Sequence, residues 1–181
     1  MSLGFFHKYF SEMNAAIETA DHNKLLKCIQ YIKRCQADRG KVIIVGNGGS
    51  AAMASHVSVD FTKAAQLRSI NFNEADLITC FGNDYGYENW VAKALEAYAD
   101  PKDLVILISS SGQSMNMING ARQCESMRLP MITLSGFKPD NPLRKLGNIN
   151  LWVDSHSYNV VEMTHHVWLL SLVDFVIAEK E

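Results

Sequence analysis

Proline and cysteine are scarce in this chain of 181 residues, with four of each, and no two cysteines form a C-x-x-C pair. Pairs at that spacing are typical of zinc sites and of dithiol redox sites. We therefore favour reduced, mostly buried thiols over a disulfide or a metal role. The cysteines are Cys28, Cys35, Cys80 and Cys124.

The chain also lacks a surplus of either charge. It has 17 Lys and Arg residues against 19 Asp and Glu residues, a net charge of −2, so no large basic surface for nucleic acid is indicated. No apolar run approaches the roughly 20 residues that span a bilayer, and no charged-then-apolar signal peptide opens the chain. We expect a cytoplasmic protein with neither a nucleic-acid nor a membrane partner.

The composition that remains is that of a soluble globular protein, with 48% hydrophobic and 20% charged residues. We expect a single domain over residues 1–181, with N-terminal helices at about 1–38 and an α/β core at about 40–181. Apolar runs typical of strands alternate with helical patterns, which predicts parallel strands in a three-layer α/β/α sandwich. The runs are 42–45, 69–72, 104–108, 130–134 and 149–153.

Helical spacing of apolar residues continues through 5–35, with a break and a new cap at Asp21-His22-Asn23, so two helices are expected there. A short helix at 75–80 is expected to lead into a turn at 82–86. Residues 159–178 form a helix that is apolar nearly all round, which is either buried or packed on another subunit. We favour a homo-oligomer with the terminal helices at its interface. A monomer whose N-terminal helices cover that surface is the alternative.

Two strand-to-helix junctions are rich in glycine and hydroxyl groups. They are Gly46-Asn47-Gly48-Gly49-Ser50 and Ser109-Ser110-Ser111-Gly112-Gln113-Ser114. Small residues at such a junction leave backbone N–H groups uncovered at a helix start, where the helix dipole favours an anion. The first junction is not G-x-G-x-x-G and has no P-loop lysine, so a nucleotide is not expected. Together the two loops favour a phosphorylated ligand over the simpler alternatives, a plain turn and an N-cap.

These two loops, with Gly82-Asn83-Asp84-Tyr85-Gly86 between them, resemble the sugar isomerase (SIS) domain family over nearly the whole chain. More narrowly, they resemble the phosphoheptose isomerases, which convert sedoheptulose 7-phosphate to D-glycero-D-manno-heptose 7-phosphate. The resemblance implies a flavodoxin-like five-stranded parallel sheet, a homotetramer, and active sites at subunit interfaces.

The resemblance also implies roles for particular residues. Ser109, Ser111 and Ser114, with Ser110 beside them, would hold the phosphate. The sugar chain would lie against Asn47, Gly48, Gly49 and Ser50, with Asp84 nearby. His56 matches a metal-binding or catalytic histidine, and Asp60 takes the position of the catalytic glutamate. Since i and i+4 share a helix face, this pair suits two ligands of Zn²⁺ or another divalent metal, or a base and its partner.

The last helix departs from the family, which supplies a glutamine there and a histidine eight residues later. The matching positions are Val161 and Leu169, and neither can bind a metal or move a proton. Asp60 is also one methylene shorter than glutamate, and a misplacement of about 1 Å can cost about 100-fold in rate. We hypothesise that His165 carries the proton or binds the metal, oriented by Glu162. A buried, hydrogen-bonded histidine is the alternative.

The sequence therefore predicts an aldose–ketose isomerase acting on a phosphosugar, with sedoheptulose 7-phosphate as the favoured substrate and heptose synthesis as its setting. Two alternatives remain. The altered last helix would fit an isomerase for another phosphosugar. It would also fit a non-catalytic SIS-domain protein that binds a phosphosugar and regulates.

Overall fold

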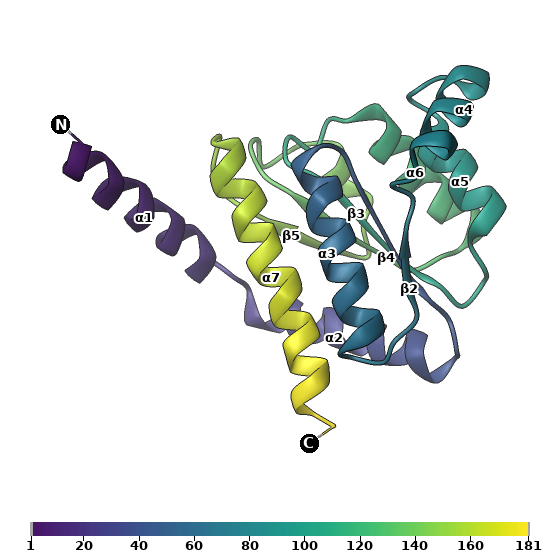
Figure 1. Ribbon diagram of the computed structural model, residues 1–181, viewed down its shortest axis with the longest axis horizontal. Coiled ribbons are helices and arrows are strands. Elements are labelled where there is room, and N and C mark those ends of the chain that lie inside the picture. Colours follow the sequence, from purple (N-terminus) through teal and green to yellow (C-terminus); the bar gives the residue numbers. More distant parts are fainter. Residues whose placement is uncertain (1, 181) are drawn as a thin grey trace.

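The computed structural model describes residues 2–180, and its centre is one five-stranded sheet (Figure 1). The strands are β1 (Val42–Gly46), β2 (Ser69–Asn71), β3 (Leu104–Ser109), β4 (Met131–Ser135) and β5 (Ile149–Trp152). The helices are α1 (Ser2–Glu18), α2 (His22–Ala37), α3 (Gly49–Lys63), α4 (Ala75–Tyr85), α5 (Trp90–Tyr98), α6 (Met115–Met127), the 3-10 helix η1 (Leu143–Lys145) and α7 (Tyr158–Ala178).

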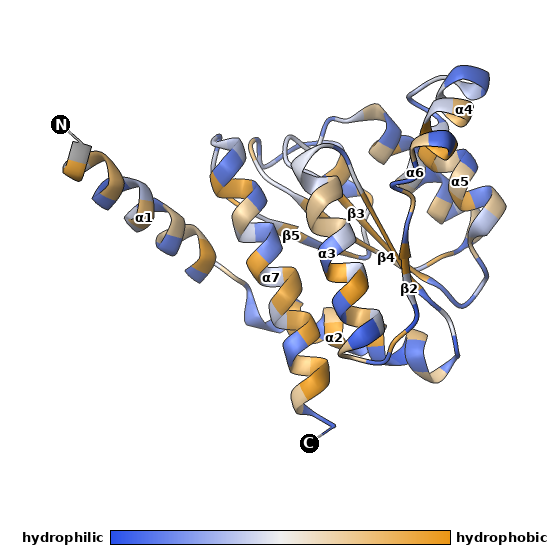
Figure 2. Ribbon diagram, viewed as in Figure 1, coloured by the Kyte–Doolittle hydropathy of each residue, from blue (hydrophilic) through white to orange (hydrophobic). Residues whose placement is uncertain are grey.

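All neighbouring strands are parallel, in the order β2-β1-β3-β4-β5. Both faces of the sheet are covered. The side chains of Val42 and Ile44 join a core under α2, α3 and α7, whereas Ile43 and Val45 join a second core under α5 and α6. This alternation follows from the two-residue period of a strand. It explains why the central strands β1 and β3 are hydrophobic over nearly their whole length (Figure 2) and confirms the expected three-layer sandwich.

The N-terminal helices are arranged as expected from the break at residue 21. The Asp21 side chain accepts a hydrogen bond from the Lys24 backbone N–H at 3.1 Å and caps α2. Helix α1 extends away from the rest of the chain in Figure 1. The Trp168 indole N–H of α7 donates to the Ile17 carbonyl at 2.9 Å and ties the end of α1 to the core.

Helix α4 is longer than the sequence indicated. The segment 82–85, expected as a turn, continues the helix to Tyr85, and Gly86 ends it with a positive φ of 83°. Gly82 faces open space, so its lack of a side chain costs the helix about 1 kcal/mol relative to alanine without breaking it. Glycine and asparagine therefore indicated a turn that the surrounding structure overrides.

Three of the four thiols are buried, as expected: Cys28, Cys35 and Cys124. Cys80 is exposed on α4, because α4 packs on the domain only through its other face. Helix α7 is long and apolar enough to cross a membrane by composition. Half of its apolar stretch is buried inside the protein, which is how the core helix of a globular domain behaves.

Candidate active site

The two glycine- and serine-rich loops lie side by side because they follow neighbouring strands. Gly46, the last residue of β1, pairs with Ile108 of β3. The chain leaves β1 toward β2 on one side, and β3 lies on the other side of β1. Ligands in open parallel sheets bind at such a switch point, beyond the carboxyl ends of the strands.

The first loop presents backbone rather than side chains. The Ser50 N–H donates to the Asn47 carbonyl at 2.9 Å, and Gly48 adopts a φ of 54° that side chains rarely allow. No side chain caps the start of α3. Because Gly48 and Gly49 are exposed, the helix N-terminus is open to an anion.

The second loop gathers hydroxyl groups at the start of α6. The Ser109 hydroxyl donates to the Ser114 hydroxyl at 3.1 Å, and the Ser111 hydroxyl accepts from the Gln113 N–H at 3.2 Å. Ser114 occupies the N-cap position, yet its side chain makes no capping bond. Among residues 2–180, the buried Ser110 hydroxyl has no hydrogen-bond partner. The Ser114 hydroxyl therefore does not act as the cap of α6 that the N-cap alternative offered.

The shape of this loop is fixed by Gly112 and Asn141. Gly112 has a φ of 65°, and its N–H donates to the Ser109 carbonyl at 2.9 Å. The buried Asn141 side chain fills the space beside it, and a Cβ on Gly112 would lie 1.9 Å from the Asn141 Oδ1. The same Oδ1 accepts the Arg144 N–H at 2.9 Å, which ties this turn to the 3-10 helix η1. Only glycine fits this turn.

The two loops are joined by a pair of amide side chains. Asn47 donates to Asn116 at 3.0 Å, and Asn116 donates back to Asn47 at 2.8 Å. The Tyr87 hydroxyl adds a third hydrogen bond to Asn47 at 3.2 Å. Asn116 and Tyr87 were not among the site residues predicted from the sequence. The signal for Asn116 was a polar residue in the first turn of a helix, directly after the serine loop.

Asp84 is not brought to these loops by any described contact. It is exposed on α4, and its carboxylate accepts from the Asn83 side chain at 2.9 Å and from the Cys80 thiol at 3.8 Å. Its predicted place near the sugar chain therefore has no hydrogen bond to support it.

Helix α3 brings His56 and Asp60 together, as their i,i+4 spacing predicted, and α7 adds His166 to them. The His56 Nε2 lies 3.2 Å from the Asp60 Oδ2. The His56 Nδ1 lies 2.9 Å from the Nε2 of His166. Burial and the neighbouring His56 lower the pKa of His166, since both disfavour its charged form. The α7 histidine in this group is thus His166 and not the predicted His165.

His165 instead points into the core. Its ring is completely buried, its Nε2 lies 3.0 Å from the Ser135 carbonyl oxygen, and its Nδ1 has no hydrogen-bond partner in the described part of the chain. Burial lowers its pKa to about 4, so the ring is neutral at pH 7 and donates from Nε2 to the carbonyl. This position matches the buried, hydrogen-bonded alternative rather than a proton carrier at the site.

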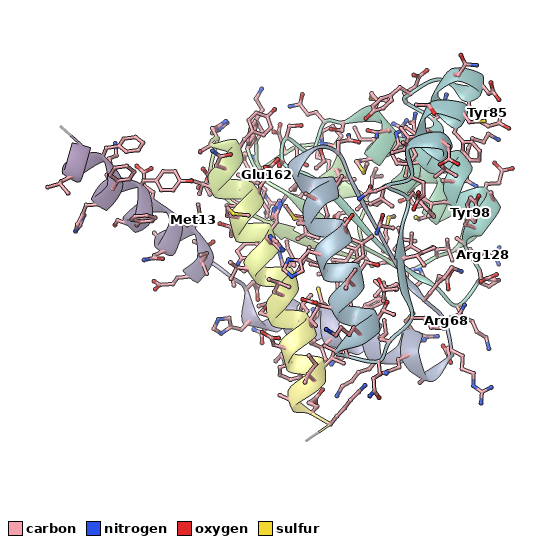
Figure 3. All side chains as sticks on the ribbon, in the orientation of Figure 1. Met13, Arg68, Tyr85, Tyr98, Arg128 and Glu162 are labelled. Carbon is pink, nitrogen blue, oxygen red and sulfur yellow. The ribbon has the colours of Figure 1, made fainter. Side chains whose placement is uncertain are left out.

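Glu162 lies at the first loop. A Cβ on Gly49 would lie 2.3 Å from the Glu162 Oε2, so the carboxylate occupies the space that any other residue at position 49 would need. Figure 3 labels Glu162 on α7, beside the start of α3. Its predicted partner His165 is hydrogen-bonded elsewhere, so Glu162 faces the site without it.

Val161 and Leu169, at the two altered family positions, are both fully buried in the core. Within residues 2–180, no three His, Cys, Asp or Glu side chains converge as metal ligands. Zinc sites use three or four protein ligands, so the donor set does not match one. A role for Zn²⁺ or another divalent metal at His56 and Asp60 stays a prediction that this donor set does not favour.

The sheet order, the paired loops and the uncapped start of α3 define an α/β domain with one sheet edge suited to a small anionic ligand. A family model described as the SIS domain matches residues 5–136. The chain therefore belongs to the SIS domain family.

Comparison with individual relatives indicates which group within this family the chain resembles. A phosphoheptose isomerase of Syntrophotalea carbinolica is 30% identical, with 96% of this chain and 91% of the relative covered. Solved phosphoheptose isomerase structures from Neisseria gonorrhoeae and Francisella tularensis share the fold, each with a TM-score of 0.89, at 23% and 24% identity. These alignments cover 97% of this chain and 99% and 98% of those chains. Within the SIS domain family, the chain groups with the phosphoheptose isomerases.

Proposed function

We propose that this protein is an aldose–ketose isomerase that interconverts sedoheptulose 7-phosphate and D-glycero-D-manno-heptose 7-phosphate through an enediol(ate). The observation that carries the proposal is the bond pair between Asn47 and Asn116, at 3.0 and 2.8 Å. It joins a loop suited to a phosphate directly to a loop suited to a sugar. The name shared by the relatives supplies the particular substrate.

The phosphate would bind at the serine loop. Ser109, Ser111 and Ser114 offer hydroxyl donors, and the first turn of α6 offers backbone N–H groups without a side-chain cap. The Ser110 hydroxyl is buried beside them. Such a neutral set of donors at a helix N-terminus suits a dianion. The binding energy of this remote group would orient the reacting end of the sugar.

The isomerisation requires three functions at the other end of the substrate. A base takes a proton from C1, and the C–H electron pair forms the double bond of the enediolate while the C2 carbonyl oxygen becomes negative. A proton then moves from O1 to O2, and a proton is returned to C2, which leaves the aldehyde at C1. Acidic side chains and histidines on α3 and α7 would move these protons, and the N-terminus of α3 would stabilise the negative oxygen.

The test is proton exchange with solvent. Purified protein is incubated with sedoheptulose 7-phosphate in D₂O, with and without added Zn²⁺, and the hydrogens at C1 and C2 are followed by NMR. We expect deuterium at these carbons and formation of the heptose phosphate. Stabilisation of the protein by the substrate without exchange would contradict the isomerase function and favour a regulator. Exchange with a different ketose phosphate alone would contradict the substrate.

We also propose that the chain forms a homo-oligomer in the cytoplasm, a tetramer as the resemblance implies. Exposed apolar side chains on the projecting helix α1 support an interface there. They include Leu3, Phe5, Phe6 and Phe10, with exposed fractions of 53–86%. Helices α3 and α7 add Val59, Met163 and Val167, each more than 40% exposed. A monomer would leave this apolar surface in water.

A further inference from the structure

We propose that Tyr87, in the turn between α4 and α5, is a specificity residue that binds one hydroxyl group of the sugar chain together with Asn47. The proposal rests on the isomerase function above and adds a contact at its sugar loop. The Tyr87 hydroxyl donates to the Asn47 Oδ1 at 3.2 Å, and Asn47 is the first residue after β1. Tyr87 therefore reaches the sugar loop from a turn 40 residues further along the chain.

The hydrogen bonds of Asn47 leave its side chain with a donor and no acceptor. A side-chain amide has an oxygen that accepts two hydrogen bonds and a nitrogen that donates two. The Asn47 Oδ1 accepts from the Asn116 Nδ2 at 2.8 Å and from the Tyr87 hydroxyl at 3.2 Å, which uses both positions. The Asn47 Nδ2 donates one hydrogen to the Asn116 Oδ1 at 3.0 Å. Within residues 2–180 its second hydrogen has no acceptor, so Asn47 offers one N–H to a ligand.

The Tyr87 hydroxyl is complementary to this N–H. Its only hydrogen is directed at Asn47, so its oxygen can only accept a further hydrogen bond. A donor and an acceptor therefore lie next to each other at the sugar loop. A ligand hydroxyl satisfies both, because it accepts and donates at once, whereas an ionised phosphate oxygen only accepts. The pair is thus suited to the sugar chain and not to the phosphate, whose place is the serine loop.

The turn that carries Tyr87 is held on both sides. Gly86 has a φ of 83°, and its carbonyl accepts from the Asn89 N–H at 3.0 Å. The Asn89 side chain donates to the carbonyl of Tyr85, the last residue of α4, at 2.9 Å; Figure 3 labels Tyr85. Trp90, the first residue of α5, is buried in the core. Tyr87 itself is 55% exposed, so this turn presents a side chain that a ligand can reach.

The experiment compares Tyr87→Phe with the control Tyr98→Phe, an exposed tyrosine of α5, in the full chain. KM and kcat are measured with sedoheptulose 7-phosphate and with its analogues that lack the hydroxyl at C3, C4, C5 or C6. The dissociation constant of inorganic phosphate is measured by calorimetry. A site that binds a substrate hydroxyl discriminates against the analogue that lacks it.

We expect Tyr87→Phe to raise KM for sedoheptulose 7-phosphate about tenfold, the effect of one lost hydrogen bond, with kcat changed less than about twofold. Its affinity for inorganic phosphate should equal that of the wild type. For one of the analogues the variant and the wild type should have the same KM, because the hydroxyl that Tyr87 binds is already missing. The control should match the wild type with every ligand.

The outcomes separate this contact from the function on which it rests. A wild-type protein that isomerises none of these sugar phosphates contradicts the proposed function, and the contact with it. An active wild type together with a Tyr87→Phe variant whose KM differs by less than about twofold contradicts the contact alone. Weaker binding of inorganic phosphate by the variant, or an equal rise in KM with every analogue, also contradicts it. Either result would place the effect in the fold or at the serine loop and not at one hydroxyl of the sugar.

Discussion

At the scale of the residue, this site depends on positions where a side chain is missing. Gly49 leaves room for the Glu162 carboxylate, and Gly112 leaves room for the Asn141 amide. Both glycines are in the two loops that meet at the switch point. Each glycine therefore leaves space for the polar side chain of one distant residue. The sequence shows the glycine but not which residue fills that space.

We expect Gly112→Ala to lower the free energy of unfolding by about 2 kcal/mol or more. Alanine would have to adopt the left-handed backbone that Gly112 has, and its Cβ would collide with Asn141. Urea denaturation followed by circular dichroism measures this. Gly82→Ala is the control, since its Cβ meets open space in a helix and adds up to about 1 kcal/mol. Equal effects of the two variants would contradict the explanation.

The buried His165 makes stability depend on pH. Its pKa is about 4 in the folded protein against an ordinary value of 6.5, so between these values the unfolded chain binds a proton that the folded chain does not. Its contribution to stability is therefore intact above pH 6.5 and falls as the pH drops toward 4. The loss reaches about 3 kcal/mol.

Paired urea titrations of wild type and His165→Gln at pH 7.5 and 4.5 test this, because glutamine keeps a donor toward the Ser135 carbonyl without titrating. We expect the wild type to lose more stability than the variant across this interval. A wild-type curve that stays parallel to that of the variant would show that His165 is not buried as a neutral ring.

The thiols should differ sharply in reactivity. Burial raises the pKa of Cys28 and Cys124 to about 12 and that of Cys35 to about 11, and only Cys80, among the four, is exposed. We expect a thiol-specific reagent to modify one cysteine per native chain and four in denaturant. Loss of the fast reaction in Cys80→Ser identifies the site, and fast modification of a second thiol would contradict the packing.

At the scale of the element, the sequence could not show which side chains of α7 face the core and which face α3. His165 and His166 are adjacent, and a helix that is apolar nearly all round gives no pattern to tell which one faces α3. Packing decides: Val161, His165 and Leu169 face the core, whereas Glu162 and His166 face α3. By contrast, both loops could be predicted, because glycine and serine between a buried strand and a helix leave backbone N–H groups uncovered at the helix start.

The link between β1 and α6 predicts a binding effect for Asn116. We expect Asn116→Ala to raise KM for the phosphosugar about tenfold with a smaller change in kcat, because Asn47 loses the partner that fixes it. The control is Asn119→Ala, one turn along α6, whose amide bonds to the Glu88 carbonyl at 3.0 Å instead. Each variant should lose about 1 kcal/mol of stability. An equal rise in KM for both would contradict the role of the loop link.

At the scale of the whole molecule, the parallel sheet could be predicted from the sequence, but the placement of α1 could not. Alternating strands and helices specify a parallel sheet with short connections, and the sheet confirms this. The sequence of residues 2–18 does not show that their phenylalanines are exposed in a single chain. Apolar residues at helical spacing look the same whether the surface they pack on belongs to this chain or to another.

If the exposed face of α1 is an interface, assembly depends on it. Light scattering coupled to size exclusion should give about four times the 20.2 kDa of one chain. The double variant Phe5→Asp and Phe6→Asp should give a smaller species, because two charges would be buried without partners. Tyr98→Asp, an exposed aromatic on α5, serves as control. A wild-type monomer at micromolar concentration would contradict the proposed oligomer.

Helix α7 is the last element of the chain to be synthesised. Every strand and both binding loops leave the ribosome before residue 158, yet Glu162 and His165 arrive only with the final helix. A prematurely terminated product would therefore hold both loops without the Glu162 carboxylate that lies against Gly49. It would also expose the strip of sheet that Val161, Leu169 and Val173 normally cover. Such a fragment would be a ready substrate for cellular proteases rather than a competitor for metabolite.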